Sequence, residues 1–320
     1  MWKITQNFSG EAPIICIGGA NIDRKLYVKD RIMAETSNPV TSSKSVGGVA
    51  RNIAENLGRL GEPVTFLTVR GADTDWLEIN RVSASFMDLT HVEEIPGSAT
   101  GSYTAVLDPL GDLSIALADM DIFDQLTPAL LAEKVDVLKT AKCIVADLNC
   151  SQEAIEYLRE FALMHQIPFA IIPVSSPKIN HLPEVFEGVE WLIVNRDETE
   201  TYFGIEMDSE AKWREAVSMW RAKGIPNVIV TNGKKGVMAS AHDEEIKHYE
   251  AILTPGVVDV TGAGDSFCSA VIHSWLAGKT LDEVVQAGLV NSHKTIQSKY
   301  TVRHELSKQP LQKDVEELIK

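Results

Sequence analysis

Short apolar runs alternate with longer amphipathic stretches along most of this chain, and this alternation limits the possible folds most strongly. The apolar runs span 14–19, 64–69, 142–147, 169–174, 191–195 and 227–232 and contain few polar residues. Strands that are covered on both faces, as in parallel sheets, have this composition. Helical patterns over 49–61, from Ser151 onward and over 209–223 separate them. The sequence therefore predicts an α/β fold: a doubly wound, mostly parallel sheet flanked by helices.

Two segments, 24–46 and 98–120, interrupt this pattern because neither contains a long helical stretch. Within residues 101–121, "DPLGD" has the composition of a turn and its flanks alternate, which predicts a hairpin. We expect the two segments to form a small β-sheet beside the main sheet, as a lid. A second hairpin, over 236–251, is expected at an edge of the main sheet. Since the chain has no repeats or long linkers, residues 1–320 are expected to form a single domain.

Charge and composition exclude several classes of partner. Lys and Arg number 30 against 45 Asp and Glu, a formal net charge of −15. Such a field repels phosphate backbones and anionic lipid, so neither nucleic acid nor a membrane surface is expected. The N-terminal residues lack the pattern of a signal peptide, and no apolar run approaches the roughly 18 residues of a membrane span. Cys16, Cys143, Cys150 and Cys268 show no paired spacing, which favours a reduced, cytoplasmic protein.

The stretch "VVDVTGAGDSF" (257–267) joins a β-branched run, expected to be a strand, to an apolar helical pattern. Gly262 and Gly264 lack Cβ atoms, so a phosphate can approach the main chain and the turn can adopt positive φ. Successive N–H groups and the N-terminus of the following helix attract anions. Asp265 stands where it can accept a proton from an attacking hydroxyl. The alternative is a tight turn with Asp as helix N-cap, and this stretch alone leaves both open.

Four elements resemble the ribokinase-like carbohydrate kinases, also called the phosphofructokinase-B family. They are "GGVARNIAENLGRLG" (47–61), "NRDE" (195–198), "TNGKKG" (231–236) and "DVTGAGDSFCSAVI" (259–272). Within that family, "GGANID" (18–23), "GSYTAVLDPLGDL" (101–113), "VADLNCSQEA" (145–154) and "SKYTV" (298–302) are most similar to pseudouridine kinases. The resemblance implies an ATP-dependent kinase that phosphorylates the 5′-hydroxyl of pseudouridine. The alternatives are another ribonucleoside or sugar as acceptor, or a catalytically silent binding protein of the same fold.

The resemblance also implies roles around the phosphates. Asp265 would be the general base, with the backbone of Gly262, Ala263 and Gly264 as anion hole, and Glu198 would hold Mg²⁺ through water. The alternative for Glu198 is a solvated helix residue. Asp259 and Thr261 match a K⁺ site of relatives, and the alternative is an Asp that bonds its own turn. The nucleotide-binding residues would be Asn195, Thr231, Gly233 and Gly236.

On the acceptor side, the resemblance implies contacts to the sugar or base from Asn21, Asp23, Gly47, Gly48, Asn52, Asn149 and Asp119. Alternatives stay open for three of them: a turn residue at Asn21, a helix-surface amide at Asn52 and a hairpin end at Asp119. Val49 stands where relatives that phosphorylate free ribose carry a lysine, which disfavours ribose. The small sheet has edges that need covering, and a homodimer through the lid is one way to cover them.

Overall fold

The computed structural model describes residues 12–242, 244–253 and 256–319. Within these residues the main sheet contains β1 (Ile14–Ile17), β4 (Val64–Leu67), β9 (Cys143–Asp147), β10 (Phe169–Ile172), β11 (Val189–Asn195), β12 (Asn227–Thr231), β13 (Val237–Ala241) and β14 (Lys247–Tyr249). Their spatial order is β14-β13-β12-β11-β10-β9-β1-β4. Neighbours from β12 to β4 pair in parallel, whereas β13 and β14 are antiparallel at one edge. The mostly parallel sheet and the edge hairpin over 236–251 are thus confirmed.

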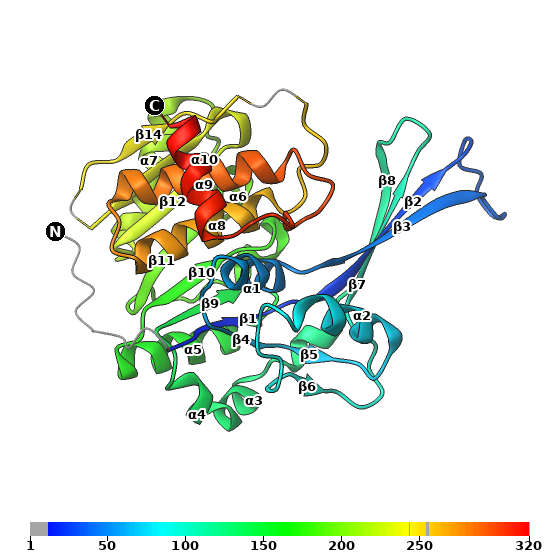
Figure 1. Ribbon diagram of the computed structural model, residues 1–320, viewed down its shortest axis with the longest axis horizontal. Coiled ribbons are helices and arrows are strands. Elements are labelled where there is room, and N and C mark those ends of the chain that lie inside the picture. The colour runs from blue at the N-terminus through cyan, green and yellow to red at the C-terminus, as the bar shows by residue number, and fades with distance from the viewer. Residues whose placement is uncertain (1–11, 243, 254–255, 320) are drawn as a thin grey trace.

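Helices cover both faces of this sheet (Figure 1). Successive strand residues alternate between the two faces: Ile14 packs in one core with Ile53, and Ile15 packs in the other core with Ile155. The doubly wound architecture is therefore confirmed. The helices are α1 (Val49–Arg59), α2 (Thr74–Ser83), α3 (Pro128–Glu133), α4 (Val135–Leu138), α5 (Gln152–His165), α6 (Arg196–Phe203), α7 (Glu210–Ala222), α8 (Ala263–Leu276), α9 (Leu281–Thr295) and α10 (Lys308–Leu318), with 3₁₀ turns η1 (Asp121–Gln125), η2 (Ser176–His181) and η3 (Gly233–Lys235).

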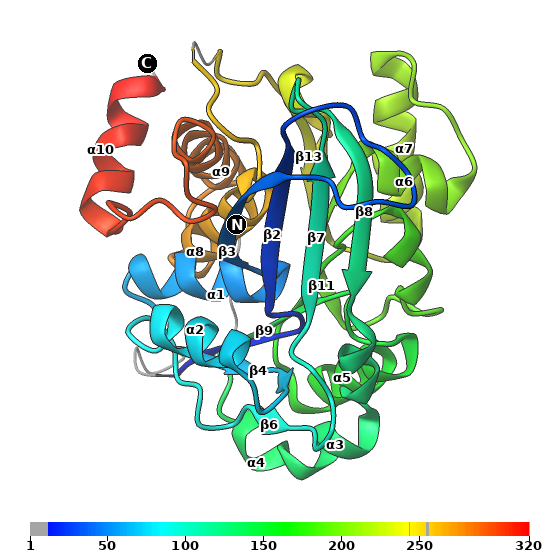
Figure 2. The ribbon, with the colours of Figure 1, turned by 90° about the vertical axis from the view of Figure 1, so that its right-hand side faces the viewer.

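A small second sheet contains β2 (Asn21–Val28), β3 (Val40–Gly47), β7 (Ser102–Leu107) and β8 (Leu113–Asp119), in the order β3-β2-β7-β8. It extends away from the main sheet (Figure 1), and its strands are seen side by side in Figure 2. The predicted hairpin is β7 and β8, and Asp108 closes its turn by accepting the N–H groups of Leu110 and Asp112, both at 2.9 Å. The sheet starts earlier than the expected boundary at residue 24, because Asn21 already pairs with Gly47.

Two expectations about strands are wrong. The run 64–69 is divided at Thr68, whose hydroxyl donates to Gly18 O at 2.6 Å, and the chain continues as β5 (Val69–Arg70), which pairs with β6 (Glu93–Glu94) in a separate sheet. The run 257–260 is not a strand. Val258 N–H donates to Ile296 O at 2.8 Å, and Val258 stays 60% exposed. Within the described residues the run pairs with no strand, and Val258 borders a cavity.

The four cysteines are all buried, and none forms a disulfide. Across the part of the chain that the structure describes, no helix combines the length and apolarity needed to cross a bilayer.

Candidate active site

The centre of the candidate site is a contact between α1 and α8. Asn52 Nδ2 donates to Asp265 Oδ2 at 2.8 Å. Asn52 is 4% exposed, so it is not a helix-surface amide. Asp265 lies in the first turn of α8, whose N-cap is Gly262. The alternative of an Asp N-cap is therefore wrong, and the carboxylate is directed to a residue of another helix.

The surroundings of Asp265 favour its protonated form. Burial raises its pKa to about 7, and the nearby carboxylates of Asp147 and Asp23 act in the same direction. The hydrogen bond from Asn52 and the positive charge of Arg51 oppose this shift. Asp265 nevertheless keeps partial solvent access. A carboxyl group with a pKa near neutrality is suited to exchanging a proton with a substrate hydroxyl.

The turn before α8 offers main-chain donors next to this carboxylate. Gly262 has φ +81°, and a Cβ there would lie 2.2 Å from Thr301 O, so this position requires glycine. Ala263 N–H already donates to Val260 O at 3.2 Å. The first N–H groups of a helix have no intrahelical partner, and no described residue accepts from Gly264 or Asp265. Of the three expected anion-hole residues, Gly262 and Gly264 have N–H groups without an acceptor among the described residues, and Asp265 N–H is a further donor of this kind.

The first strand of the small sheet brings two predicted acceptor-side residues together. Asn21 Nδ2 donates to Asp23 Oδ1 at 2.6 Å, and Asn21 is 6% exposed, so it is a strand residue and not a turn residue. The other carboxylate oxygen of Asp23 faces Gly47, where a Cβ would lie only 2.2 Å away. Burial raises the pKa of Asp23. Gly48, with φ +104°, is the N-cap of α1, and Asn52 lies one turn further along that helix.

Asp147, at the end of β9, organises this half of the site, and the sequence interpretation missed it. Its carboxylate accepts N–H groups from Gly19 at 3.1 Å, Ala50 at 2.9 Å and Asn149 at 2.9 Å. Asn149 Nδ2 donates to it as well, at 3.1 Å. Burial raises the pKa of Asp147, and these N–H donors oppose the shift. An acid that ends an otherwise apolar strand was the available signal, since parallel strands present their carboxyl ends to ligand sites.

The predicted nucleotide-binding residues gather at the carboxyl ends of β11 and β12. Asn195 and Thr231 are partners in the parallel register. Gly233 and Gly236 bound the short turn η3 and have φ of +51° and +91°. Gly236 allows close packing, because a Cβ there would meet Tyr249 O at 2.0 Å. The structure thus brings these four residues to one edge of the sheet.

Glu198 is 2% exposed, so the alternative of a solvated helix residue is wrong. With Asn195 it forms a capping box at the start of α6, in which Asn195 N–H donates to Glu198 Oε2 at 2.8 Å. Burial raises its pKa to about 7, and the neighbouring Asp197 adds to this. The charges of Glu198 and Asp265 both raise the pKa of the Cys268 thiol on α8. The two carboxylates therefore lie near the same part of that helix. No described basic side chain neutralises Glu198, and a buried carboxylate of this kind suits a divalent cation.

Asp259 is already bonded on both oxygens. Its Oδ1 accepts the N–H of Thr261 at 2.9 Å and the hydroxyl of Thr261 at 2.7 Å, which is the alternative of an Asp that bonds its own turn. Its Oδ2 lies 2.7 Å from Nζ of Lys25, on β2. As arranged, these residues do not fit a K⁺ site, because a lysine ammonium holds the carboxylate. Lys25 therefore ties the small sheet to the segment that precedes the α8 turn.

Among the predicted acceptor-side residues, Asp119 points away from Asp23. Tyr103 pairs with Asp23 on one side and with Ala118 on the other, so these three share a face of the small sheet. Side chains alternate along a strand, and Asp119 therefore points to the opposite face.

Tyr103, Asp23 and Lys25 line a cavity of about 1000 Å³ that reaches to Asp259.

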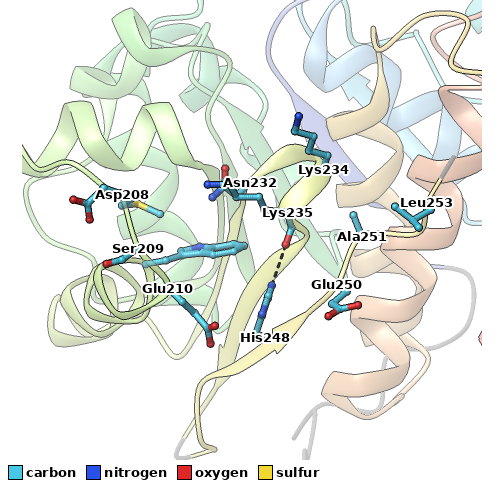
Figure 3. A pocket seen from close by; sticks show the side chains of 12 residues that line it. Asp208, Ser209, Glu210, Asn232, Lys234, Lys235, His248, Glu250, Ala251 and Leu253 are labelled. Atoms are coloured by element: carbon cyan, nitrogen blue, oxygen red, sulfur yellow. Dashed lines mark hydrogen bonds between the residues drawn. The ribbon is translucent and has the colours of Figure 1, made fainter.

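A second cavity, of about 390 Å³, lies beside η3. Figure 3 shows Asp208, Ser209 and Glu210 on one side of it and Ala251 and Leu253 on the other. Between them His248 Nε2 lies 3.0 Å from the carbonyl oxygen of Lys235. No residue that the structure describes lines both cavities. Residues of the η3 turn therefore line this second cavity, which is separate from the cavity beside the small sheet.

Comparisons with known proteins show the family of this chain. Residues 12–307 match the pfkB family carbohydrate kinases. The chain is 30% identical over 297 residues to the pseudouridine kinase of Escherichia coli (strain K12), covering 92% of this chain and 93% of that protein. It is 25% identical over 277 residues to the guanosine-inosine kinase of Exiguobacterium acetylicum, covering 86% and 91%.

The fold is also similar to that of solved kinases. The structure of Arabidopsis thaliana ribokinase complexed with ribose and ATP superposes with a TM-score of 0.83 at 19% identity, covering 95% of this chain and 98% of that one. A carbohydrate kinase from Agrobacterium tumefaciens gives 0.80 at 29% identity, covering 95% and 97%. With a family match over nearly the whole chain and the same fold, this protein belongs to the pfkB family of carbohydrate kinases.

Proposed function

We propose that this pfkB-family kinase transfers the γ-phosphoryl group of ATP to the 5′-hydroxyl of pseudouridine. The observation that carries the kinase chemistry is the position of Asp265, a carboxylate next to two unpartnered N–H groups of α8. A proton acceptor beside a main-chain anion site is what in-line transfer between two oxygens requires. A protein that only binds a nucleoside has no need of this pair.

In the proposed reaction the 5′-hydroxyl gives its proton to Asp265 as its oxygen attacks the γ-phosphorus. The bond from that phosphorus to the β–γ bridging oxygen breaks, and ADP leaves. The N–H groups of Gly264 and Asp265 stabilise the charge on the transferring phosphoryl group. Asn21, Asp23 and Asn149 orient the acceptor by hydrogen bonds to its hydroxyl groups. Most of the rate then comes from positioning and charge stabilisation.

Glu198 is the residue that would hold Mg²⁺, through water, next to the nucleotide edge formed by Asn195 and Thr231. The buried, un-neutralised carboxylate of Glu198 supports this proposal. Bound Mg²⁺ neutralises phosphate charge, and it commonly keeps several waters and takes only one or two protein carboxylates. No step is assigned to K⁺, because Lys25 already forms an ion pair with the carboxylate of Asp259.

One comparison supports pseudouridine as the acceptor: the Escherichia coli relative that is 30% identical over most of both chains is a pseudouridine kinase. The cavity beside Asp23, about 1000 Å³, is at the upper end of small-ligand sites. Its size supports a nucleoside over a free sugar, because it has room for a base as well as a ribose. The guanosine-inosine kinase relative makes a purine ribonucleoside the second candidate.

The test is ADP release with pseudouridine, uridine, guanosine, inosine, ribose and fructose 6-phosphate as acceptors. Pseudouridine and uridine differ in one ring N–H, and a site that bonds this group should prefer pseudouridine in kcat/KM by about 10²-fold or more. Asp265→Asn purified in parallel controls for contaminating kinases. A preference for ribose or a hexose phosphate would contradict the acceptor and leave the kinase chemistry standing.

We also propose that the small sheet closes over the acceptor as a lid and pairs with a second copy. Its edge strand β8 carries Ile115 and Leu117, which are 50% and 55% exposed. They lie two residues apart, so they share a face. Exposed apolar residues on an unpaired edge strand favour association.

A further inference from the structure

Arg51 is a buried cation directly beneath the candidate active site, and the mechanism above does not use it. It is 1% exposed. Its Nη1 donates to Asn52 Oδ1 at 2.9 Å and its Nε donates to Ser83 Oγ at 3.1 Å. Its Nη2 forms an ion pair with Glu55, which is also paired with Arg59 at 2.7 Å. The guanidinium is therefore fixed by three partners on two helices.

The geometry creates a chain of contacts that ends at Asp265. A guanidinium has only donors, so the atom of the Asn52 amide that faces Arg51 must be the oxygen. The amide nitrogen then faces the other way, and it donates to Asp265 at 2.8 Å. Arg51 thus determines which end of the Asn52 amide meets the catalytic carboxylate.

We propose that Arg51 is a positioning residue for the general base, which locks the Asn52 amide as a hydrogen-bond donor to Asp265 in both protonation states of that carboxylate. This inference rests on the proposed role of Asp265. An amide that could rotate would present its oxygen to protonated Asp265 and accept the new O–H. With Arg51 in place that rotation would set the amide N–H groups against the guanidinium N–H groups. Protonated Asp265 therefore gains no acceptor from Asn52 and releases its proton more readily.

Other charged groups around Asp265 do not supply this effect. Asp23 of β2 and Asp147 of β9 are both acids that favour its protonated form, and Glu198 of α6 is a further acid near Cys268. Glu55 is engaged by Arg51 and Arg59. Lys25, the cation of β2, is paired with Asp259. Among the charged groups that act on Asp265, Arg51 is the cation.

The first experiment measures kcat/KM against pH for wild type, Arg51→Met, Arg51→Lys and Ser83→Ala. Arg51→Met should move the acid limb of this pH profile up by about one pH unit and lower turnover at pH 7 about fivefold, because Asn52 is no longer held. Arg51→Lys keeps the charge but loses the planar fork, so it should show most of this shift. Ser83→Ala removes a partner of Arg51 that does not reach Asn52, and its acid limb should stay at the wild-type pH. Melting temperatures report any purely structural effect separately.

The second experiment is a double-mutant cycle between Arg51 and Asn52. Arg51→Lys keeps the positive charge that lowers the pKa of Asp265 directly. If Arg51 acts through Asn52, adding Arg51→Lys to Asn52→Ala should therefore change kcat by less than about twofold, since interacting residues are non-additive. Additive losses, or an Arg51→Met protein whose acid limb is unmoved, would overturn the inference. If Arg51→Met does not fold, Arg51→Lys with the same cycle decides the question. Should Asp265→Asn retain wild-type turnover, the proposed base role itself fails, whatever the Arg51 variants show.

Discussion

Replacing Asp265 by asparagine should make the protein inactive and, at neutral pH and above, more stable. Burial raises the pKa of Asp265 from 3.8 to about 7. A carboxyl group whose pKa is higher in the folded state stabilises the fold while protonated, and this contribution is lost as pH rises through about 7. The shift of about three pKa units, at 1.36 kcal/mol each, corresponds to at most about 4 kcal/mol. Because Asp265 keeps partial solvent access, we expect Asp265→Asn to gain about 2–4 kcal/mol at pH 8.

The gain should depend on pH in a defined way. Near pH 4 the wild-type carboxyl is protonated in the folded state, so the variant and wild type should have similar free energies of unfolding. The difference should grow from about pH 4 to about pH 7, the unfolded-state and folded-state pKa values of Asp265, and stay nearly constant above that. Turnover should fall by about 10²–10⁴-fold, since an amide cannot take the hydroxyl proton. Acceptor binding should change little, because the new amide oxygen can still accept from Asn52.

Urea unfolding of both proteins at several pH values between 4 and 8 measures the difference in the free energy of unfolding. Steady-state ADP release measures turnover, and calorimetry measures acceptor binding. In wild type, kcat/KM should rise with pH through about 7, as the base ionises. A stability difference that is the same at every pH, or a variant with near-wild-type turnover, would refute the reasoning.

Three further perturbations test other parts of the site. Gly264→Ala should retain or slightly raise the melting temperature, since nothing lies within 4 Å of the added Cβ, yet it should lose turnover because that Cβ obstructs the phosphate. Gly262→Ala is its matched control and should unfold at lower temperature, because the Cβ would meet Thr301 O at 2.2 Å. Full activity in Gly264→Ala would count against the proposed anion hole. Glu198→Gln keeps an acceptor for Asn195 N–H, so it should fold normally but need about tenfold more Mg²⁺ for half-maximal activity; an unchanged Mg²⁺ titration would remove Glu198 from the metal site. Leu117→Lys should convert a wild-type dimer to a monomer in sedimentation, and a monomeric wild type would disprove the association through β8.

Much of the fold could be predicted from local patterns. Continuous apolar runs such as 142–147 predicted strands covered on both faces, and the structure has β9 there, in the middle of the sheet. The β7–β8 hairpin was predictable because "DPLGD" is a turn by its composition. The run 257–260 shows where such reasoning fails. Its valines favour a strand, but a strand needs a neighbour with free backbone groups, and the run pairs with no strand within the described residues.

Local sequence patterns predict most of the strands and helices and the glycine-lined turn at Gly262–Asp265, because periodicity and glycine–acid spacing are properties of adjacent residues. Which side chains meet depends on the three-dimensional arrangement of these elements. Asn52 reaches Asp265 across 213 positions of the chain, and Lys25 reaches Asp259 across 234. The same arrangement also determines that Glu198 is buried and that Asp119 points away. Such contacts depend on the spatial order of the strands and on the face to which each side chain is directed, and neither can be read from a single stretch of residues.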